Sequence, residues 1–230
     1  MRSLLLSPAA AVLRLLAGVR RRRGDKTRIL LVRPDHIGDI LLTTPALRVL
    51  RANSPNASIT YLVGPWSKRV VEGNPNVDEI LTHDFSWFNR RRPRTPFEPY
   101  LGLFHLVRSL RDGSFDTAIS LRSDFWFGAL LTNALGIPRR IGYDVRECRP
   151  FLSETVSYTG RLHEVEKNLR LVRAACNLGE EQAWRTVSHS LDFYVSSEER
   201  EFAEGFLRSH GVGDGDVLVA TELDPSARHA

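Results

Sequence analysis

An aspartate in a polar turn is the residue of this sequence best placed to do chemistry. Asp39 follows an apolar run, Ile29–Val32, and opens a segment whose apolar residues recur at helical spacing. Pro34 ends the strand pattern, and Gly38 lets a backbone approach a ligand closely. A carboxylate in the first turn of a helix is stabilised in its charged form by the helix dipole. We therefore expect an ionised Asp39 that can accept a proton or hydrogen bond from a hydroxyl group, although such an acid can also serve only the helix terminus.

Further candidate binding residues lie in the same turn and after a later strand. Asp35, His36 and Gly38 share the loop with Asp39. Arg122 and Asp124 follow a predicted strand at its carboxyl end, which is the edge where open parallel sheets bind ligands. His36 could equally be a solvated loop residue, and Arg122 and Asp124 could pair with each other.

The sequence lacks the motifs of several other chemistries. Gly38 stands alone, without the G-x-G-x-x-G pattern of a dinucleotide site or the G-x-x-x-x-G-K-[ST] pattern of a P-loop. It also lacks H-E-x-x-H, a Cys/His cluster and the G-x-S-x-G elbow of hydrolases. We therefore expect neither a metal nor a bound cofactor.

Alternating strand and helix patterns must position these residues. The predicted strands are Arg28–Arg33, Ser58–Val63, Asp78–Thr82, Phe115–Leu121 and Arg139–Gly142. The predicted helices between them are Ile37–Ala52, Ser67–Gly73, Pro99–Arg111 and Asp124–Leu135. This alternation is typical of an α/β protein with a parallel, doubly wound sheet.

The later part of the chain continues the alternation. Apolar residues from Leu162 to Cys176 predict a helix that Gly179 ends. A short strand is predicted at Leu191–Val195, and a capping box of Ser196 and Glu199 begins a helix that runs through Ser209. The last predicted strand, Asp216–Leu223, looks like the beginning of a second domain whose remainder is absent.

Composition and charge limit the cellular compartment and the classes of binding partner that fit this chain. The 230 residues are 42% hydrophobic and carry a net charge of +5, with arginine runs at positions 20–23 and 90–94. Anionic lipid, a nucleotide-sugar or nucleic acid could bind such runs, but no recognition motif supports nucleic acid. Cys148 and Cys176 lie far apart and have no metal-type spacing. Two such cysteines make a disulfide framework improbable, which favours a reducing, cytoplasmic setting.

The first 23 residues combine an apolar segment with the arginine run that follows it. A signal peptide would place its positive charges before the apolar core, and Arg14 interrupts a segment already short for a membrane span. The pattern favours an interfacial helix on an anionic membrane surface, with a helix docked on the protein or a true span as alternatives.

The strand and turn around Asp39 also resemble a known family. The stretch RILLVRPDHIGDILLTTPALRVLRANSPNASITYLV is similar to the N-terminal motif of the lipopolysaccharide heptosyltransferases, glycosyltransferase family 9. Further matches follow in the family's order, namely NPNVDEIL, FDTAISLRSD, LGIPRRIGYD and HEVEKNLRLVRAACNLG. The resemblance covers about Arg28 to Ala220.

This resemblance implies the N-terminal half of a GT-B glycosyltransferase, in which two Rossmann-like halves face each other across a cleft. Residues 1–24 would be an amphipathic, basic leader, 25–190 the Rossmann-like acceptor-binding domain, and 191–230 a linker helix with a truncated start of the donor-binding domain. Thr221–Ala230 departs from the loop that the family has there. The alternative is a catalytically inactive acceptor-binding module without its donor half.

The resemblance also implies a reaction. Asp39 matches the family's general base, which deprotonates an acceptor hydroxyl as that oxygen attacks the anomeric carbon with inversion. The donor would be an ADP-sugar such as ADP-heptose, and the acceptor a lipopolysaccharide core or related envelope glycan. Asp35, His36, Gly38, Arg122 and Asp124 would line the acceptor site. The protein would be cytoplasmic and peripheral to the inner membrane, which residues 1–23 would contact.

Overall fold

A computed structural model of the protein describes residues 26–85, 98–179, 188–213 and 215–219. The leader, residues 1–24, lies outside the described residues, and so does the arginine run at positions 90–94. The chain divides into two compact units, Met1–Tyr194 and Val195–Ala230.

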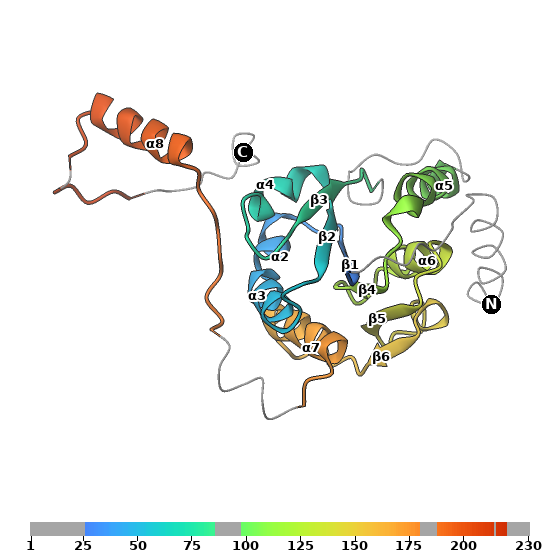
Figure 1. Cartoon of the computed structure of the whole chain (residues 1–230). Helices are drawn as coiled ribbons and strands as arrows, with labels where there is room; N and C mark the ends of the chain where they lie inside the picture. Colours follow the sequence, from blue (N-terminus) through green and yellow to red (C-terminus); the bar gives the residue numbers. More distant parts are fainter. Residues whose placement is uncertain (1–25, 86–97, 180–187, 214, 220–230) are drawn as a thin grey trace, which may run out of the picture. The chain divides into compact units, whose positions relative to one another are not determined.

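The first unit is built on one sheet of six parallel strands (Figure 1). The strands are β1 (Arg28–Arg33), β2 (Ser58–Val63), β3 (Glu79–Thr82), β4 (Thr117–Ser120), β5 (Arg139–Tyr143) and β6 (Glu154–Val156). Their order across the sheet is β3-β2-β1-β4-β5-β6. This is the doubly wound order of a Rossmann-type sheet, so the predicted fold class is confirmed.

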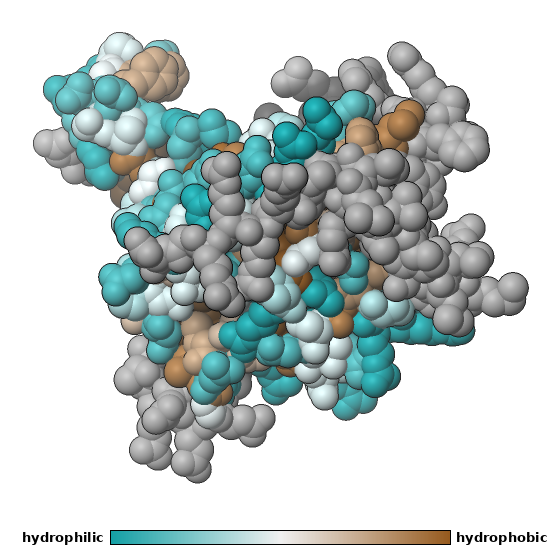
Figure 2. All heavy atoms as spheres, turned by 45° about the vertical axis from the view of Figure 1, so that its right-hand side comes forward, coloured by the Kyte–Doolittle hydropathy of each residue, from teal (hydrophilic) through white to brown (hydrophobic). Residues whose placement is uncertain are grey.

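Helices cover both faces of this sheet because its inner strands are apolar on both sides. In β1, Leu30 and Val32 join one buried cluster, while Ile29 and Leu31 join the other. Figure 1 shows α5 and α6 on one side of the sheet and α2, α3, α4 and α7 on the other. In Figure 2, hydrophilic residues cover most of the described surface in view, which fits an apolar interior.

The helices of the first unit lie within or close to the predicted segments, with one predicted helix divided in two and short 3-10 turns added. They are α2 (Ile37–Leu41), α3 (Thr44–Asn53), η1 (Pro65–Ser67), α4 (Lys68–Val71), α5 (Glu98–Leu110), η2 (Arg111–Gly113), α6 (Trp126–Ala134), η3 (Arg149–Phe151) and α7 (Glu164–Cys176). The sequence prediction missed β6, a strand of only three residues of which two are exposed and one is half-buried, because so short a segment shows no clear alternation. No described helix has both the length and the apolar character needed to cross a membrane.

The single helix predicted over Ile37–Ala52 is wrong, because the structure breaks it between α2 and α3. Pro45 has no N–H to donate to the carbonyl of Leu41. The hydroxyl of Thr44 donates to that carbonyl instead, at 2.8 Å, and the hydroxyl of Thr43 donates to the carbonyl of Ile40 at 2.7 Å. Two threonines before a proline therefore supply hydroxyl partners for the carbonyls of Ile40 and Leu41 where α2 ends, and α3 begins at Thr44.

Two predictions on the later segments also need correction. The helix α7 ends because Asn177 adopts a left-handed conformation (φ 55°), two residues before the predicted stop at Gly179. The stretch Leu191–Val195 forms no strand. Its residue Asp192 forms an ion pair with Arg48 and donates its backbone N–H to the Thr44 hydroxyl at 3.0 Å. Side chains of α3 therefore supply the partners of Asp192, in place of a neighbouring strand.

The second unit contains the helix α8 (Ser197–Ser209). Its predicted capping box is confirmed: the Ser196 hydroxyl accepts from the backbone N–H of Glu199, and the Glu199 carboxylate accepts from that of Ser196. The predicted last strand, Asp216–Leu223, is wrong for its described residues 216–219. These residues pair with no strand, and Val217 is 90% exposed, since the described part of this unit offers no sheet to join.

Candidate functional site

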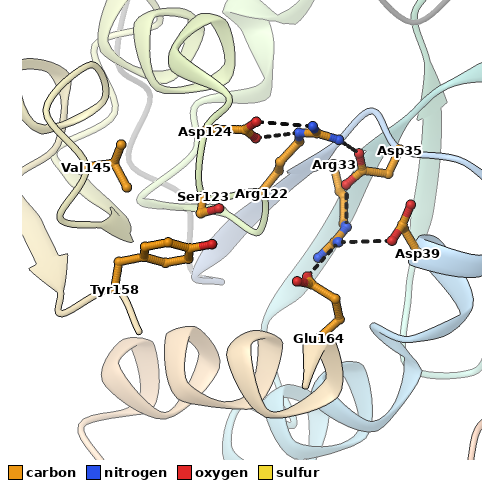
Figure 3. A pocket seen from close by; sticks show the side chains of 9 residues that line it. All are labelled: Arg33, Asp35, Asp39, Arg122, Ser123, Asp124, Val145, Tyr158 and Glu164. Atoms are coloured by element: carbon orange, nitrogen blue, oxygen red, sulfur yellow. Dashed lines mark hydrogen bonds and ion pairs between the residues drawn. The ribbon is translucent and has the colours of Figure 1, made fainter. Parts of the chain in front are cut away.

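A cavity lies at the carboxyl edge of the sheet, at the topological switch point where the strand order reverses. From β1 the sheet grows through β2 to one side and through β4 to the other, which leaves a crevice beyond the ends of β1 and β4. The cavity has a volume of about 380 Å³. Figure 3 shows its lining residues: Arg33, Asp35, Asp39, Arg122, Ser123, Asp124, Val145, Tyr158 and Glu164.

Arg33, the last residue of β1, lies buried under the cavity with a side chain only 3% exposed. Its Nε lies 2.7 Å from Asp35 Oδ2, an ion pair without hydrogen-bond geometry. Its Nη1 donates to Asn168 Oδ1 at 2.6 Å, and its Nη2 donates to Glu164 Oε2 at 3.1 Å. One guanidinium therefore joins the end of β1 to the first turns of α7, more than 130 residues later in the chain.

Arg122, just beyond β4, links the other side of the crevice. Its Nε and Nη2 donate to the two oxygens of Asp124, at 2.6 and 3.2 Å, and its Nη1 donates to Asp35 Oδ1. The hydrogen bonds from Arg122 hold the pKa of the Asp124 carboxyl below its usual range. Asp35 is 1% exposed, so it acts on the cavity mainly by positioning two arginines.

Asp39 lines the cavity from the first turn of α2 with its side chain 41% exposed. One of its oxygens lies 3.9 Å from Arg33 Nη2, and among the described residues its carboxylate accepts no hydrogen bond. Figure 3 shows the carboxylate directed toward the other charged side chains of the cavity. It is therefore neither turned out to open solvent nor held in a buried ion pair, and a hydroxyl group could reach it.

Glu164 lines the opposite wall from the first turn of α7. His163 caps this helix, because its Nδ1 accepts from the backbone N–H of Val165 at 3.3 Å. Partial burial would raise the pKa of Glu164, but hydrogen bonds from Lys167 (2.6 Å) and Arg33 outweigh it and hold that pKa below its usual range. The wall facing α2 therefore presents a charged carboxylate as well.

The structure brings together four of the six site residues predicted from the sequence. Asp35, Asp39, Arg122 and Asp124 line the cavity, and the predicted pairing of Arg122 with Asp124 is also present. His36 and Gly38 are exposed beside the cavity and do not line it. The His36 ring lies 6.2 Å from that of Trp66.

The sequence prediction missed five lining residues: Arg33, Ser123, Val145, Tyr158 and Glu164. A signal existed for two of them. Arg33 ends the strand that leads to Asp39, and Glu164 lies in the motif HEVEKN that resembles the family. Val145 follows β5 and Tyr158 follows β6, both on irregular segments where no periodicity predicts which side chains face a cavity.

Among the described residues, no group of three or more His, Cys, Asp or Glu side chains is placed to hold a metal ion. The carboxylates of the cavity face arginines instead.

Comparison with known proteins confirms the resemblance seen in the sequence. The sequence model described as "Glycosyltransferase family 9 (heptosyltransferase)" matches residues 103–208. The chain is 29% identical over 107 residues to lipopolysaccharide heptosyltransferase 3 of Escherichia coli, which is 46% of this chain and 29% of that protein. It is 28% identical over 120 residues to lipopolysaccharide heptosyltransferase 2 of Escherichia coli strain K12, 50% of this chain and 31% of that protein.

Solved structures agree with the sequence comparisons. The crystal structure of a family 9 glycosyltransferase from Veillonella parvula matches 84% of this chain with a TM-score of 0.69 and 26% identity. The E. coli ADP-heptose lipopolysaccharide heptosyltransferase II matches 82% with a TM-score of 0.58 and 20% identity, which supports the fold alone. In both cases the chain spans 52% of the length of the solved protein.

Proposed function

Starting from this resemblance to glycosyltransferase family 9, we propose that the chain supplies the acceptor-binding half of an inverting glycosyltransferase of heptosyltransferase type. The donor is an ADP-sugar, with ADP-heptose as the first candidate. The acceptor is a lipopolysaccharide core or a related envelope glycan. The protein works on the cytoplasmic side of the inner membrane, and its residues 1–23 contact the membrane surface.

The position of Asp39 is the observation that carries this proposal. Its carboxylate lines the cavity at the switch point of the sheet, is 41% exposed, and lies 3.9 Å from the Arg33 guanidinium. A general base must be within reach of the proton that it removes and must not already be saturated by hydrogen bonds. Among the lining carboxylates, Asp35 is buried, whereas Asp124 and Glu164 accept two hydrogen bonds each from side chains. Asp39 is the lining carboxylate that fits the role.

The proposed reaction follows from that position. An acceptor hydroxyl enters the cavity and donates a hydrogen bond to Asp39. As its oxygen forms a bond to the anomeric carbon of the donor, the bond from that carbon to the phosphate oxygen of ADP breaks, and the proton passes to Asp39. Attack from the side opposite the leaving group inverts the anomeric configuration.

The other predicted residues support binding in this proposal. Asp124 and Arg122 offer polar atoms at the rim of the cavity, while buried Asp35 keeps Arg122 and Arg33 in place. A Cβ atom added at Gly38 would meet nothing within 4 Å, so packing does not require glycine there. We propose that Gly38 and His36 leave room for the acceptor beside Asp39.

The donor half must come from further sequence or another chain, because binding both substrates together supplies much of the rate. The relatives are longer than the part matched here, and one structural relative is an E. coli heptosyltransferase solved with ADP, of which this chain spans 49%. That complex supports an ADP-sugar as the donor.

Replacement of the base tests the proposal. The chain is joined to a donor-binding half and assayed with ADP-heptose and several lipopolysaccharide-core acceptors. Asp39→Asn should lower the rate of transfer by about 10²- to 10⁴-fold, the usual contribution of general base catalysis. Donor binding, measured by calorimetry, should not change.

Asp112→Asn is the matched control. Asp112 also lies in the first turn of a short helix, η2, with an arginine nitrogen 3.7 Å away, but it precedes β4 at the opposite edge of the sheet. Its replacement should leave transfer unchanged. Near-wild-type transfer by Asp39→Asn removes the general-base role, and a wild-type protein that transfers no sugar contradicts the enzyme proposal.

A further inference from the structure

The described residues that line the cavity carry more negative than positive charge. Its lining includes four carboxylates, on Asp35, Asp39, Asp124 and Glu164, but two guanidinium groups, on Arg33 and Arg122. By formal charge the described lining is therefore acidic, although the whole chain is basic at +5. An anionic group that enters this cavity meets more repulsion than attraction.

The positive groups of the cavity already have partners. Arg33 is 3% exposed and contacts Asp35, Glu164 and the side chain of Asn168. Arg122 holds both oxygens of Asp124 and contacts Asp35. Lys167, behind Glu164, donates to that carboxylate at 2.6 Å. A phosphate group is bound by arginine and lysine donors, so in this cavity it would compete with the carboxylates that already hold them.

The carboxylates, in contrast, retain capacity to accept hydrogen bonds from a ligand. The Asp39 carboxylate accepts none among the described residues and is 41% exposed. The Asp124 side chain is 67% exposed, and the Glu164 side chain is 35% exposed. An ionised carboxylate only accepts hydrogen bonds, so its ligand must bring donors, and the hydroxyl groups of a sugar are such donors.

An aromatic ring completes the wall. Tyr158 is 44% exposed although it lines the cavity, and Figure 3 shows its ring extending into the cavity from the side opposite Asp39. Its ring stands edge to face with that of Tyr143, with 5.3 Å between centroids, and Lys167 Nζ lies 5.5 Å from its centroid. The ring is thus held in position while it offers apolar surface to a ligand.

Together these features describe a ligand with hydroxyl donors at its edge, an apolar face and no negative charge. We propose that the cavity binds an uncharged sugar ring of the acceptor, with hydroxyl groups on Asp39, Asp124 and Glu164 and a ring face against Tyr158. The same cavity excludes a ring that carries a phosphate ester. This inference rests on the proposed function and names the substrate class of its acceptor site.

Two probes that differ by one phosphate test the inference. A methyl heptoside and the same heptoside with one phosphate monoester are titrated into the full chain, and binding is followed by ligand-observed NMR. Like charges brought together in an interface repel each other, and salt screening at an open cavity weakens this repulsion. We therefore expect the neutral heptoside to bind at least about tenfold more tightly at physiological salt.

Variants connect the selectivity to the named groups. Asp124→Asn removes one negative charge and releases Arg122, so it should improve binding of the phosphate ester relative to the neutral heptoside. Tyr158→Ala should weaken binding of the neutral heptoside by about tenfold, the size of a lost aromatic contact, whereas Tyr158→Phe should not. Thermal unfolding of each variant establishes that it is folded.

Equal or tighter binding of the phosphate ester overturns the inference, and so does a neutral heptoside that fails to bind at millimolar concentration. Unchanged selectivity in Asp124→Asn overturns it as well. These outcomes are distinct from failure of the proposed function, because they are measured without donor and without transfer. An enzyme that depends on Asp39 but prefers a phosphorylated ring would keep the proposed function and lose this inference.

Discussion

The two edges of the sheet both contain arginine–carboxylate pairs, but the pairs have different surroundings. At the amino edge, Arg51 contacts Asp78 at 2.6 Å and the carbonyl of Ala57 at 2.8 Å. Arg139 at the start of β5 binds Glu154 at the start of β6 through two hydrogen bonds, at 2.8 and 3.0 Å, and also the carbonyl of Ala174. Each of these arginines has one acidic partner and otherwise contacts carbonyl and amide oxygens.

At the carboxyl edge, by contrast, each arginine has more than one acidic partner. Arg33 lies within 4 Å of the carboxylates of Asp35, Asp39 and Glu164, and Arg122 contacts both Asp35 and Asp124. Acids therefore outnumber arginines around a cavity, whereas at the amino edge the arginines mainly join neighbouring segments. We infer that the amino-edge pairs serve the fold, and we propose that the carboxyl-edge network holds carboxylates in place for a ligand.

Removal of one arginine from each edge should separate these two roles most clearly. Arg33→Met keeps much of the side-chain volume but leaves buried Asp35 without one of its cations. We expect it to lower the free energy of unfolding by about 3–5 kcal/mol, the usual effect of breaking a buried ion pair. Arg139→Met should cost about 1–2 kcal/mol, because Glu154 is 45% exposed and the main loss is hydrogen bonds to carbonyl oxygens.

Urea denaturation measures both values in one buffer. Equal losses for Arg33→Met and Arg139→Met contradict the distinction between the two edges.

Glu164, at the carboxyl edge, should contribute to the loss of folding stability at acid pH. Its pKa in the folded protein lies below the ordinary 4.5, so its contribution is present above pH 4.5 and is lost as the pH falls through the folded-state pKa. Glu164→Gln should flatten the loss of stability in this acid range. The effect should stay below about 1 kcal/mol, because the side chain is 35% exposed.

Glu166→Gln is the control on the same helix. Glu166 also lies in the first turn of α7 but does not line the cavity. Stability of the two variants is measured by urea denaturation over the acid range. A Glu164→Gln profile that matches those of wild type and Glu166→Gln shows that the pairs of Glu164 add nothing to stability.

The smallest expected effect on stability has the opposite sign. Gly38→Ala adds a methyl group to open space within a helix, so it should raise the free energy of unfolding by about 0.5–1 kcal/mol. If Gly38 leaves room for the acceptor, the same change should lower transfer in the enzyme with its donor half.

Gly102→Ala in α5 is the matched control, since its added Cβ also meets nothing within 4 Å and the residue does not line the cavity. It should raise stability in a similar way and leave transfer unchanged. Full activity of Gly38→Ala would mean that the acceptor does not approach this turn.

Much of the fold could be predicted because its signals are local. Strand β1 and helix α7 have apolar patterns of the right length and period, and their predicted positions agree with the structure within about two residues, the usual accuracy of element boundaries. The break after α2 was missed although Pro45 signalled it, because the apolar spacing continues across the break. Leu191–Val195 shows the converse error, an apolar stretch that is not a strand because no other strand lies beside it.

The sequence by itself determined the alternation of strands and helices, the acidic turn with Asp39, and the resemblance to a glycosyltransferase family. Only the tertiary structure decided which charges meet. Strand order brings Arg122 to Asp35 across 87 positions, and the packing of α7 brings Glu164 to Arg33 across 131. Local periodicity encodes which face of an element is buried, but contacts between distant elements depend on how the whole sheet assembles, so the acidic cavity became visible only in three dimensions.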